Sequence, residues 1–260
     1  MNYPFGIGYV NGHLWVTNVN NNNLQEWVTN GASPVTTITT FNGAATFYTP
    51  TGIGLDPVAG NVYVTDEING QVEVFGPTGT YLTTFGNTQL NLAGPNCVAV
   101  NSAGTTVYVM AFGTNKAYTY SITAGTPPLY AYQSGFTFGA SGSAPATLHW
   151  PYDLKIDGGG DFWVADFYNH RVAEYNAAGV YAQAFTLPAP SPNPAGLYVD
   201  GSGNVYVASN NGYVVEFNPS GTVIGEFGRG ILSSPGGITS DGAGNFYVTD
   251  VNNNQIVAFH

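Results

Sequence analysis

The chain has 260 residues, 43% of them hydrophobic and 14% aromatic, so it is long enough to bury a large core. Its four Lys and Arg residues are scattered along a chain with 15 Asp and Glu, which gives a net charge of −11 and excludes the clustered cations that nucleic-acid binding requires. No apolar run approaches the roughly 18 residues of a membrane helix, so we expect no membrane span.

Six prolines, each at the start of a short apolar run, mark an internal repeat with a spacing of 41 to 56 residues. They are Pro4, Pro50, Pro95, Pro151, Pro194 and Pro235. We therefore expect one domain over residues 1–260, built of six units at about 3–47, 48–93, 94–149, 150–191, 192–233 and 234–260.

Within a unit, the proline-led strand is followed by a tight turn and a second strand, as in residues 59–66, 159–166, 202–209 and 243–250. Gly-Asn or Gly-Asp in these turns favours a two-residue hairpin. A third and a fourth strand follow, each closed by an aromatic residue, with the two aromatics ten positions apart: Phe75 and Phe85, Tyr175 and Phe185, Phe217 and Phe227. Four antiparallel strands repeated six times predict an all-β, six-bladed β-propeller.

Three motifs recur in the units, namely P-x-G-I-x-x-D, G-N-x-Y-V-T-D and N-x-x-V-x-x-F, most legibly in residues 50–75, 151–175 and 235–259. In these motifs the chain resembles the NHL-repeat family of six-bladed β-propellers. The resemblance implies a fold that serves RNA-binding and protein-binding modules, sensor domains and a zinc-dependent amidating lyase. Related six-bladed propellers include lactonases and strictosidine-synthase-like enzymes.

The chain departs from two groups within that family. RNA-binding members present a basic face, which four scattered cations cannot form. The amidating lyase requires several histidines around a central metal, whereas His13, His149, His170 and His260 lie in different blades and contexts. Neither G-x-S-x-G nor H-E-x-x-H occurs. We therefore expect no catalytic residue set, no metal and no cofactor.

Repeated carboxylates are expected to have structural roles. Asp66, Asp166 and Asp250 end the second strand of their blades, and an Asn follows each of them three residues later. We expect these carboxylates to satisfy the backbone of the following turn. The runs DGGGD, DGSGN and DGAGN at 157–161, 200–204 and 241–245 lack the other ligands of a calcium loop and predict hairpin turns.

Blade four carries the richest set of candidate binding residues, which are Trp150, Tyr152, Asp153 and Lys155 around its first strand and Phe167, Tyr168, His170 and Arg171 in its second-to-third-strand loop. In a propeller these two segments lie on the same face, so we expect the groups to converge near the pore mouth and to bind a glycan or a peptide. Lys155 stands where other blades have small or neutral residues, and Asp153 and Asp157 flank it on the same side of the strand. A local ion pair with one of them is therefore favoured over a ligand or catalytic role.

Blade six ends after its third strand. In the other blades, the aromatic residue that closes the third strand is followed ten positions later by the one that closes the fourth. Only His260 follows Phe259, so we expect the outer strand of blade six to be missing. Residues 1–3 are too few to supply it, since a strand needs about five residues. The exposed edge would be Gln255, Ile256, Val257, Ala258 and Phe259, without a Lys or Pro to block pairing.

Such an edge predicts self-association into a ring or a filament, with the β-capable run in residues 133–149 of a second copy as the pairing strand. A blade that tolerates three strands, and a chain that is a fragment of a longer one, are the alternatives.

Three functions remain open. The first is a non-catalytic structural or adhesive subunit that assembles through the blade-six edge; few charges and many Asn, Thr and Gly residues favour an extracellular or cell-surface location. The second is a monomeric ligand-binding module that uses the blade-four face. The third is a propeller enzyme of lyase or lactonase type.

Overall fold

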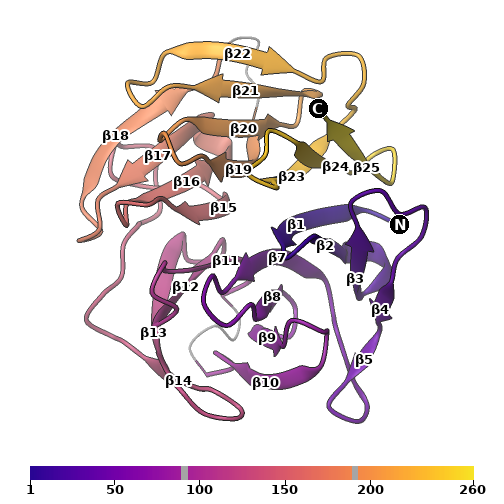
Figure 1. The fold of residues 1–260 in the computed structure, drawn as a ribbon. Helices are drawn as coiled ribbons and strands as arrows, with labels where there is room; N and C mark the ends of the chain where they lie inside the picture. The colour runs from indigo at the N-terminus through magenta and orange to yellow at the C-terminus, as the bar shows by residue number, and fades with distance from the viewer. Residues whose placement is uncertain (89–92, 189–192) are drawn as a thin grey trace.

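Six antiparallel sheets surround a common axis in a computed structural model that describes residues 1–88, 93–188 and 193–260 (Figure 1). The first five sheets have four strands and the last has three. The all-β, six-bladed propeller expected from the sequence is therefore confirmed, including the missing outer strand of blade six.

In each blade the first strand lies nearest the axis, and the later strands lie successively farther out in chain order. Blade one holds β1 (Pro4–Val10), β2 (His13–Asn18), β3 (Asn23–Val28) and β4 (Thr36–Ile38), followed by a small hairpin of β5 (Thr40–Phe41) and β6 (Ala45–Thr46). Blade two holds β7 (Pro50–Leu55), β8 (Val62–Asp66), β9 (Gln71–Phe75) and β10 (Tyr81–Phe85). Blade three holds β11 (Pro95–Val100), β12 (Thr106–Ala111), β13 (Lys116–Thr123) and β14 (Leu129–Tyr132).

The second half repeats the pattern. Blade four holds β15 (Pro151–Ile156), β16 (Phe162–Asp166), β17 (Arg171–Tyr175) and β18 (Tyr181–Thr186). Blade five holds β19 (Pro194–Val199), β20 (Val205–Ser209), β21 (Tyr213–Phe217) and β22 (Val223–Phe227), and blade six holds β23 (Pro235–Ser240), β24 (Phe246–Asp250) and β25 (Gln255–Phe259). In the described parts of the chain, helix is confined to two short 3₁₀ turns, η1 (Val19–Asn21) and η2 (Phe167–Asn169), and no helix is long and apolar enough to cross a membrane.

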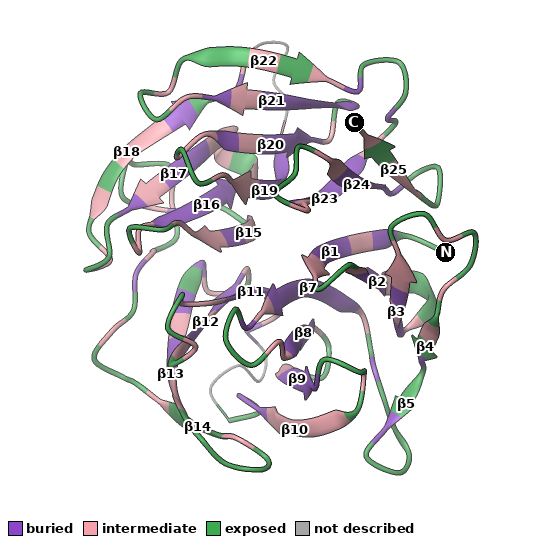
Figure 2. Cartoon of the chain, in the orientation of Figure 1, coloured by how far each residue is buried: buried purple, intermediate pink, exposed green. Residues whose placement is uncertain are grey.

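The core lies between the blades. Six hydrophobic clusters of buried residues occupy the six interfaces between neighbouring blades. Buried residues are concentrated in the strands, and many of the connecting turns are exposed (Figure 2). The interface between blades six and one has the fewest fully buried apolar residues, which are Ile7, Leu14, Val16 and Tyr247. Burial of apolar area between blades is thus the main force that holds the ring, and the closing interface is its least buried part.

The innermost strands approach one another closely around the axis. Each of them has a β-bulge just after its proline, where the register to the second strand shifts. A Cβ atom on Gly6 would overlap the carbonyl oxygen of Thr51, and one on Gly196 would overlap that of Gly236. Glycine is required at these two positions because the backbones of adjacent blades touch there.

Blade one and blade six close the ring by hydrogen bonds and packing, without a shared strand. The Thr249 hydroxyl donates to the Phe5 carbonyl (2.8 Å), and the rings of Tyr9 and Tyr247 stack with centroids 6.2 Å apart. The outer edge of β25 has no neighbouring strand among the described residues.

Candidate functional site

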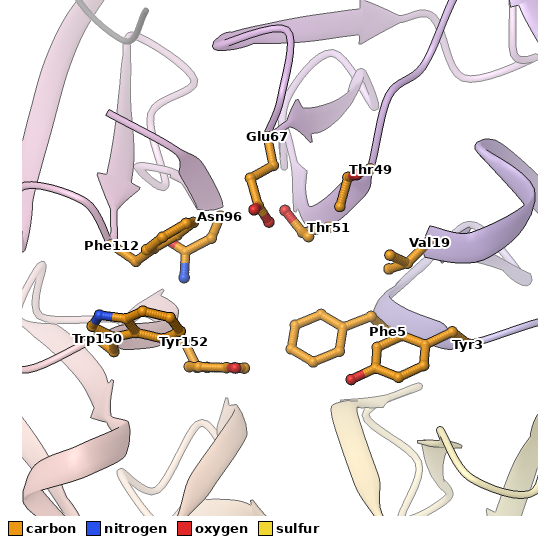
Figure 3. Close-up of a pocket in the computed structure, with 10 residues that line it drawn as sticks. All are labelled: Tyr3, Phe5, Val19, Thr49, Thr51, Glu67, Asn96, Phe112, Trp150 and Tyr152. Carbon is orange, nitrogen blue, oxygen red and sulfur yellow. The ribbon is translucent and has the colours of Figure 1, made fainter. Parts of the chain in front are cut away.

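A hollow of about 200 Å³ opens where the inner strands begin, and we call it the mouth pocket (Figure 3). Its lining comes from three repeat positions: the residue before the proline (Tyr3, Thr49, Trp150), the residue after it (Phe5, Thr51, Asn96, Tyr152), and the residue after the second strand (Val19, Glu67, Phe112). All ten belong to blades one to four. Blades five and six have non-aromatic residues at the same positions and do not line the pocket, so the pocket lies to one side of the axis.

The backbone aims three of these side chains into the pocket. Tyr3, Thr49 and Trp150 have φ angles of 55°, 67° and 55°, although each is a non-glycine residue before a proline. The N–H group of each donates to the side-chain oxygen of an Asn in the preceding blade, at 2.7, 2.9 and 2.8 Å for Asn254, Asn22 and Asn115 respectively. Strain of this kind, held by surrounding contacts, is concentrated at functional sites.

The aromatic residues form one connected series of rings across blades one, four and three. Centroid distances along it are 6.5 Å (Tyr3–Phe5), 5.7 Å (Phe5–Tyr152), 4.1 Å (Tyr152–Phe167), 5.0 Å (Phe167–Tyr168), 5.4 Å (Tyr168–Trp150) and 5.1 Å (Trp150–Phe112). Ring contacts therefore join the two blade-four segments, and of their residues Trp150 and Tyr152 line the mouth pocket, whereas Phe167 and Tyr168 pack behind them. Trp150, with 39% of its surface exposed, offers a ring to a ligand.

Four polar side chains complete the pocket, those of Thr49, Thr51, Glu67 and Asn96. The Thr51 hydroxyl bonds that of Thr65 (3.0 Å), and the Asn96 amide donates to the Pro151 carbonyl. Burial raises the pKa of the Glu67 carboxyl above its ordinary value, and burial also raises the pKa of Tyr152 to about 12, which keeps that phenol neutral.

Asp153 and Lys155 lie below the mouth pocket, against the inner strands. Lys155 Nζ contacts both Asp153 carboxylate oxygens at 2.7 and 2.8 Å, and Asp153 Oδ2 also accepts the N–H of Leu197 in blade five (2.8 Å). Asp157, the other candidate partner of Lys155, accepts the N–H groups of its own turn and the indole N–H of Trp163. The ion pair therefore links blades four and five.

His170 and Arg171 are not part of the mouth pocket. Arg171 Nε pairs with Asp166 Oδ2 (2.8 Å), and its Nη2 donates to the carbonyls of Ala144 (2.9 Å) and Thr147 (2.6 Å). His170 ends η2 in a left-handed conformation. Arg171 thus fastens the extension between blades three and four, residues 133–149, to blade four.

That extension does not form the strand suggested by its sequence. Phe138 is buried against Phe162 and Tyr175, and its carbonyl accepts the N–H of Ala117. The run is occupied within its own molecule because its aromatic residues fill the interface between blades three and four. Residues 133–149 therefore contain no strand that could pair with a second copy.

The repeated aspartates have structural roles, with one difference from the expectation. Asp66, Asp166 and Asp250 accept the amide of the Asn three residues later at 2.8, 2.8 and 2.7 Å. Their other oxygen accepts N–H groups of the segment that enters the same blade, rather than of the following turn. Asp157, Asp200 and Asp241 accept N–H groups within their hairpin turns. Within the described residues, no three His, Cys, Asp or Glu side chains are grouped so as to hold a metal ion.

Eight of the ten lining residues were not among those proposed from the sequence, because they belong to blades one, two and three: Tyr3, Phe5, Val19, Thr49, Thr51, Glu67, Asn96 and Phe112. A signal was available. Glu67, Phe112 and Phe167 occupy the same repeat position directly after the second strand, so comparing the blades position by position would have found them.

Comparisons with known proteins agree with this architecture. The family model of the NHL repeat matches residues 148–175 and 232–259, in blades four and six. The chain is therefore a six-bladed β-propeller in which two of the six repeats match the NHL model. No curated protein matches the sequence.

Solved structures with similar folds have diverse functions. An inactive variant of virginiamycin B lyase from Staphylococcus aureus, with quinupristin, has a TM-score of 0.67 and 16% identity over 99% of this chain and 80% of that one. A chain of the nidogen/laminin complex has 0.65 and 18% over 90% and 83%. Hydrazine synthase of Kuenenia stuttgartiensis has 0.68 and 12% over 100% and 96%. At such identities the likeness shows the fold alone.

Proposed function

We propose that the chain is a ligand-binding propeller module whose binding site is the mouth pocket. The observation that carries this proposal is the convergence of ten side chains, half of them aromatic, from equivalent positions of four blades on one hollow. Concave, mainly apolar sites with a few polar groups are typical of small-ligand binding. A glycan or a peptide side chain is of suitable size, and strained backbone at three lining residues supports a functional role.

A thermal-shift screen of glycans, peptides and small amines tests the proposal. A ligand raises the melting temperature of the wild type, and Trp150→Leu or Tyr152→Leu removes that rise. Trp27→Leu, which removes an indole from β3 outside the pocket, serves as the matched control. If every ligand binds the wild type and Trp150→Leu equally well, or if no ligand of the three classes binds, the proposal fails.

Self-assembly is a second candidate, favoured by the outer edge of β25, which has no neighbouring strand among the described residues. Gln255 and Ala258 on this strand are exposed, and a groove of about 290 Å³ lies between β25 and blade one. A strand of a second copy would complete the four-stranded blade by β-augmentation. Size-exclusion chromatography with light scattering, together with negative-stain electron microscopy, tests this: rings or filaments support it, and a monomer contradicts it.

For either function we propose an extracellular or cell-surface location. The support is compositional, since only 7% of residues are charged. Fractionation of cells that express the native gene would show a cytoplasmic protein if this is wrong.

A further inference from the structure

The Glu67 carboxylate stands in the mouth pocket without a counter-charge. In the chain as described, no hydrogen bond or ion pair joins its oxygens to another residue, and Figure 3 shows it facing the aromatic rings. A carboxylate that loses hydration without gaining a partner is unfavourable for the free protein. A ligand that brings positive charge would offset this cost.

The cations of the chain are placed elsewhere. Lys155, Arg171 and Arg229 pair with Asp153, Asp166 and Glu226, at 2.7, 2.8 and 2.6 Å. The remaining one, Lys116, is an exposed residue at the start of β13 and does not line the pocket. A cation that neutralises Glu67 would therefore have to come from a ligand, and a net charge of −11 attracts cations to the protein.

The remaining lining suits a methylated ammonium group better than a free one. A free ammonium has three N–H donors that need acceptors. Besides the Glu67 carboxylate, the pocket offers mainly the Thr49 hydroxyl and the Asn96 amide oxygen as acceptors, because the Thr51 hydroxyl is bonded to Thr65 and half of the lining residues are aromatic. Aromatic faces attract an ammonium ion without requiring N–H groups, as in the cages that recognise quaternary ammonium and methyl-lysine.

We propose that the mouth pocket binds a methylated ammonium group, with Glu67 as its counter-ion and the rings of Phe5, Phe112, Trp150 and Tyr152 around it. This inference rests on the proposed ligand-binding function of the same pocket. The group occurs in a choline-like small molecule and in the methylated lysine of a peptide. Both sources share the chemistry that the pocket recognises.

Isothermal titration calorimetry tests the inference with two matched pairs of ligands. Choline is compared with its neutral isostere, in which a tert-butyl group replaces trimethylammonium, and a trimethyl-lysine peptide with its unmethylated form. The methylated cations bind at least about tenfold more tightly than their counterparts. Stronger binding of choline indicates a small-molecule source, and stronger binding of the peptide indicates a protein source.

Variants separate charge from shape. Glu67→Gln weakens binding of the cation by at least about tenfold, whereas Glu226→Gln, an equal charge change on β22, leaves it unchanged. Phe112→Leu keeps an apolar side chain but removes a ring, and it also weakens binding. Circular dichroism shows that each variant is folded.

Equal binding of choline and its neutral isostere, unchanged binding in Glu67→Gln, or no binding of any methylated ammonium compound overturns the inference. The proposed function has its own readout: a neutral glycan or peptide that binds the wild type and not Trp150→Leu would uphold it while the ammonium inference fails.

Discussion

Asn254, in the last blade, accepts a 2.7 Å hydrogen bond through its side-chain oxygen from the backbone N–H of Tyr3, in the first. The bond crosses the interface that closes the ring and fixes the left-handed backbone of a residue in the mouth pocket. Closure of the propeller and the shape of the pocket therefore depend on the same contact.

Replacing Asn254 with glycine tests this link. Glycine keeps the left-handed backbone (φ 54°) and removes only the side-chain acceptor, so we expect a loss of about 1 kcal/mol in the free energy of unfolding. Asn11→Gly is the control, because Asn11 is also left-handed (φ 52°) but lies in the β1–β2 turn. Urea denaturation that finds the two variants equally stable would contradict the role of Asn254.

Lys155→Met tests the ion pair beneath the pocket. It leaves Asp153 largely buried without its cation, so we expect a destabilisation of about 1 to 3 kcal/mol, and the double variant Asp153→Asn/Lys155→Met recovers part of it. Ligand binding at the mouth pocket should persist in the folded double variant. If binding is lost while stability is unchanged, Lys155 contacts the ligand instead.

The stability of the fold should depend on pH through buried carboxyls. Burial raises the pKa of Glu73 from 4.5 to about 7 and that of Asp66 from 3.8 to about 6. The folded state then holds protons that the unfolded chain releases, so their stabilising contribution is complete below about pH 4 and is lost as the pH rises through 7.

Glu73→Gln should reduce this dependence by about 2 to 3 kcal/mol, because glutamine does not titrate. Its amide oxygen can still accept the hydrogen bond from Thr84, so the local structure is kept. Denaturant titrations from about pH 4 to 8 measure it, with the exposed Glu226→Gln as the control. An unchanged pH slope in Glu73→Gln would show that Glu73 does not carry the effect.

If β25 mediates assembly, a lysine on its edge should block it. Ala258→Lys places a charge at an exposed position of that strand, and edge lysines oppose strand pairing. Light scattering should then report a monomer for this variant and an assembly for the wild type. Ile224→Lys, on the outer strand of blade five, is the control. An assembly that survives Ala258→Lys is built through another surface.

Local sequence signals predicted most of the fold. The proline spacing and the hairpin turns fixed the number of blades, and the aromatic pairs Phe75/Phe85, Tyr175/Phe185 and Phe217/Phe227 do lie at the ends of third and fourth strands. The missing strand of blade six followed from the same rule. These features recur at the same positions of successive repeats, which a sequence pattern records directly.

The site was predictable only in part, because it is built between repeats. Trp150 and Tyr152 were found from local enrichment in blade four, whereas Glu67 and Phe112 reach the same hollow from other blades through the ring geometry. Arg171 looked equally suited to a ligand by residue type. Its side chain turns to Asp166 and to the extension at 133–149, an interaction that the order of residues does not reveal.

The most direct test of the proposed binding site is a crystal structure of the chain with the ligand that most raises its melting temperature. We expect that ligand between the rings of Trp150, Tyr152 and Phe5, with any positive charge next to Glu67. A ligand bound elsewhere, for example in the groove beside β25, would contradict it.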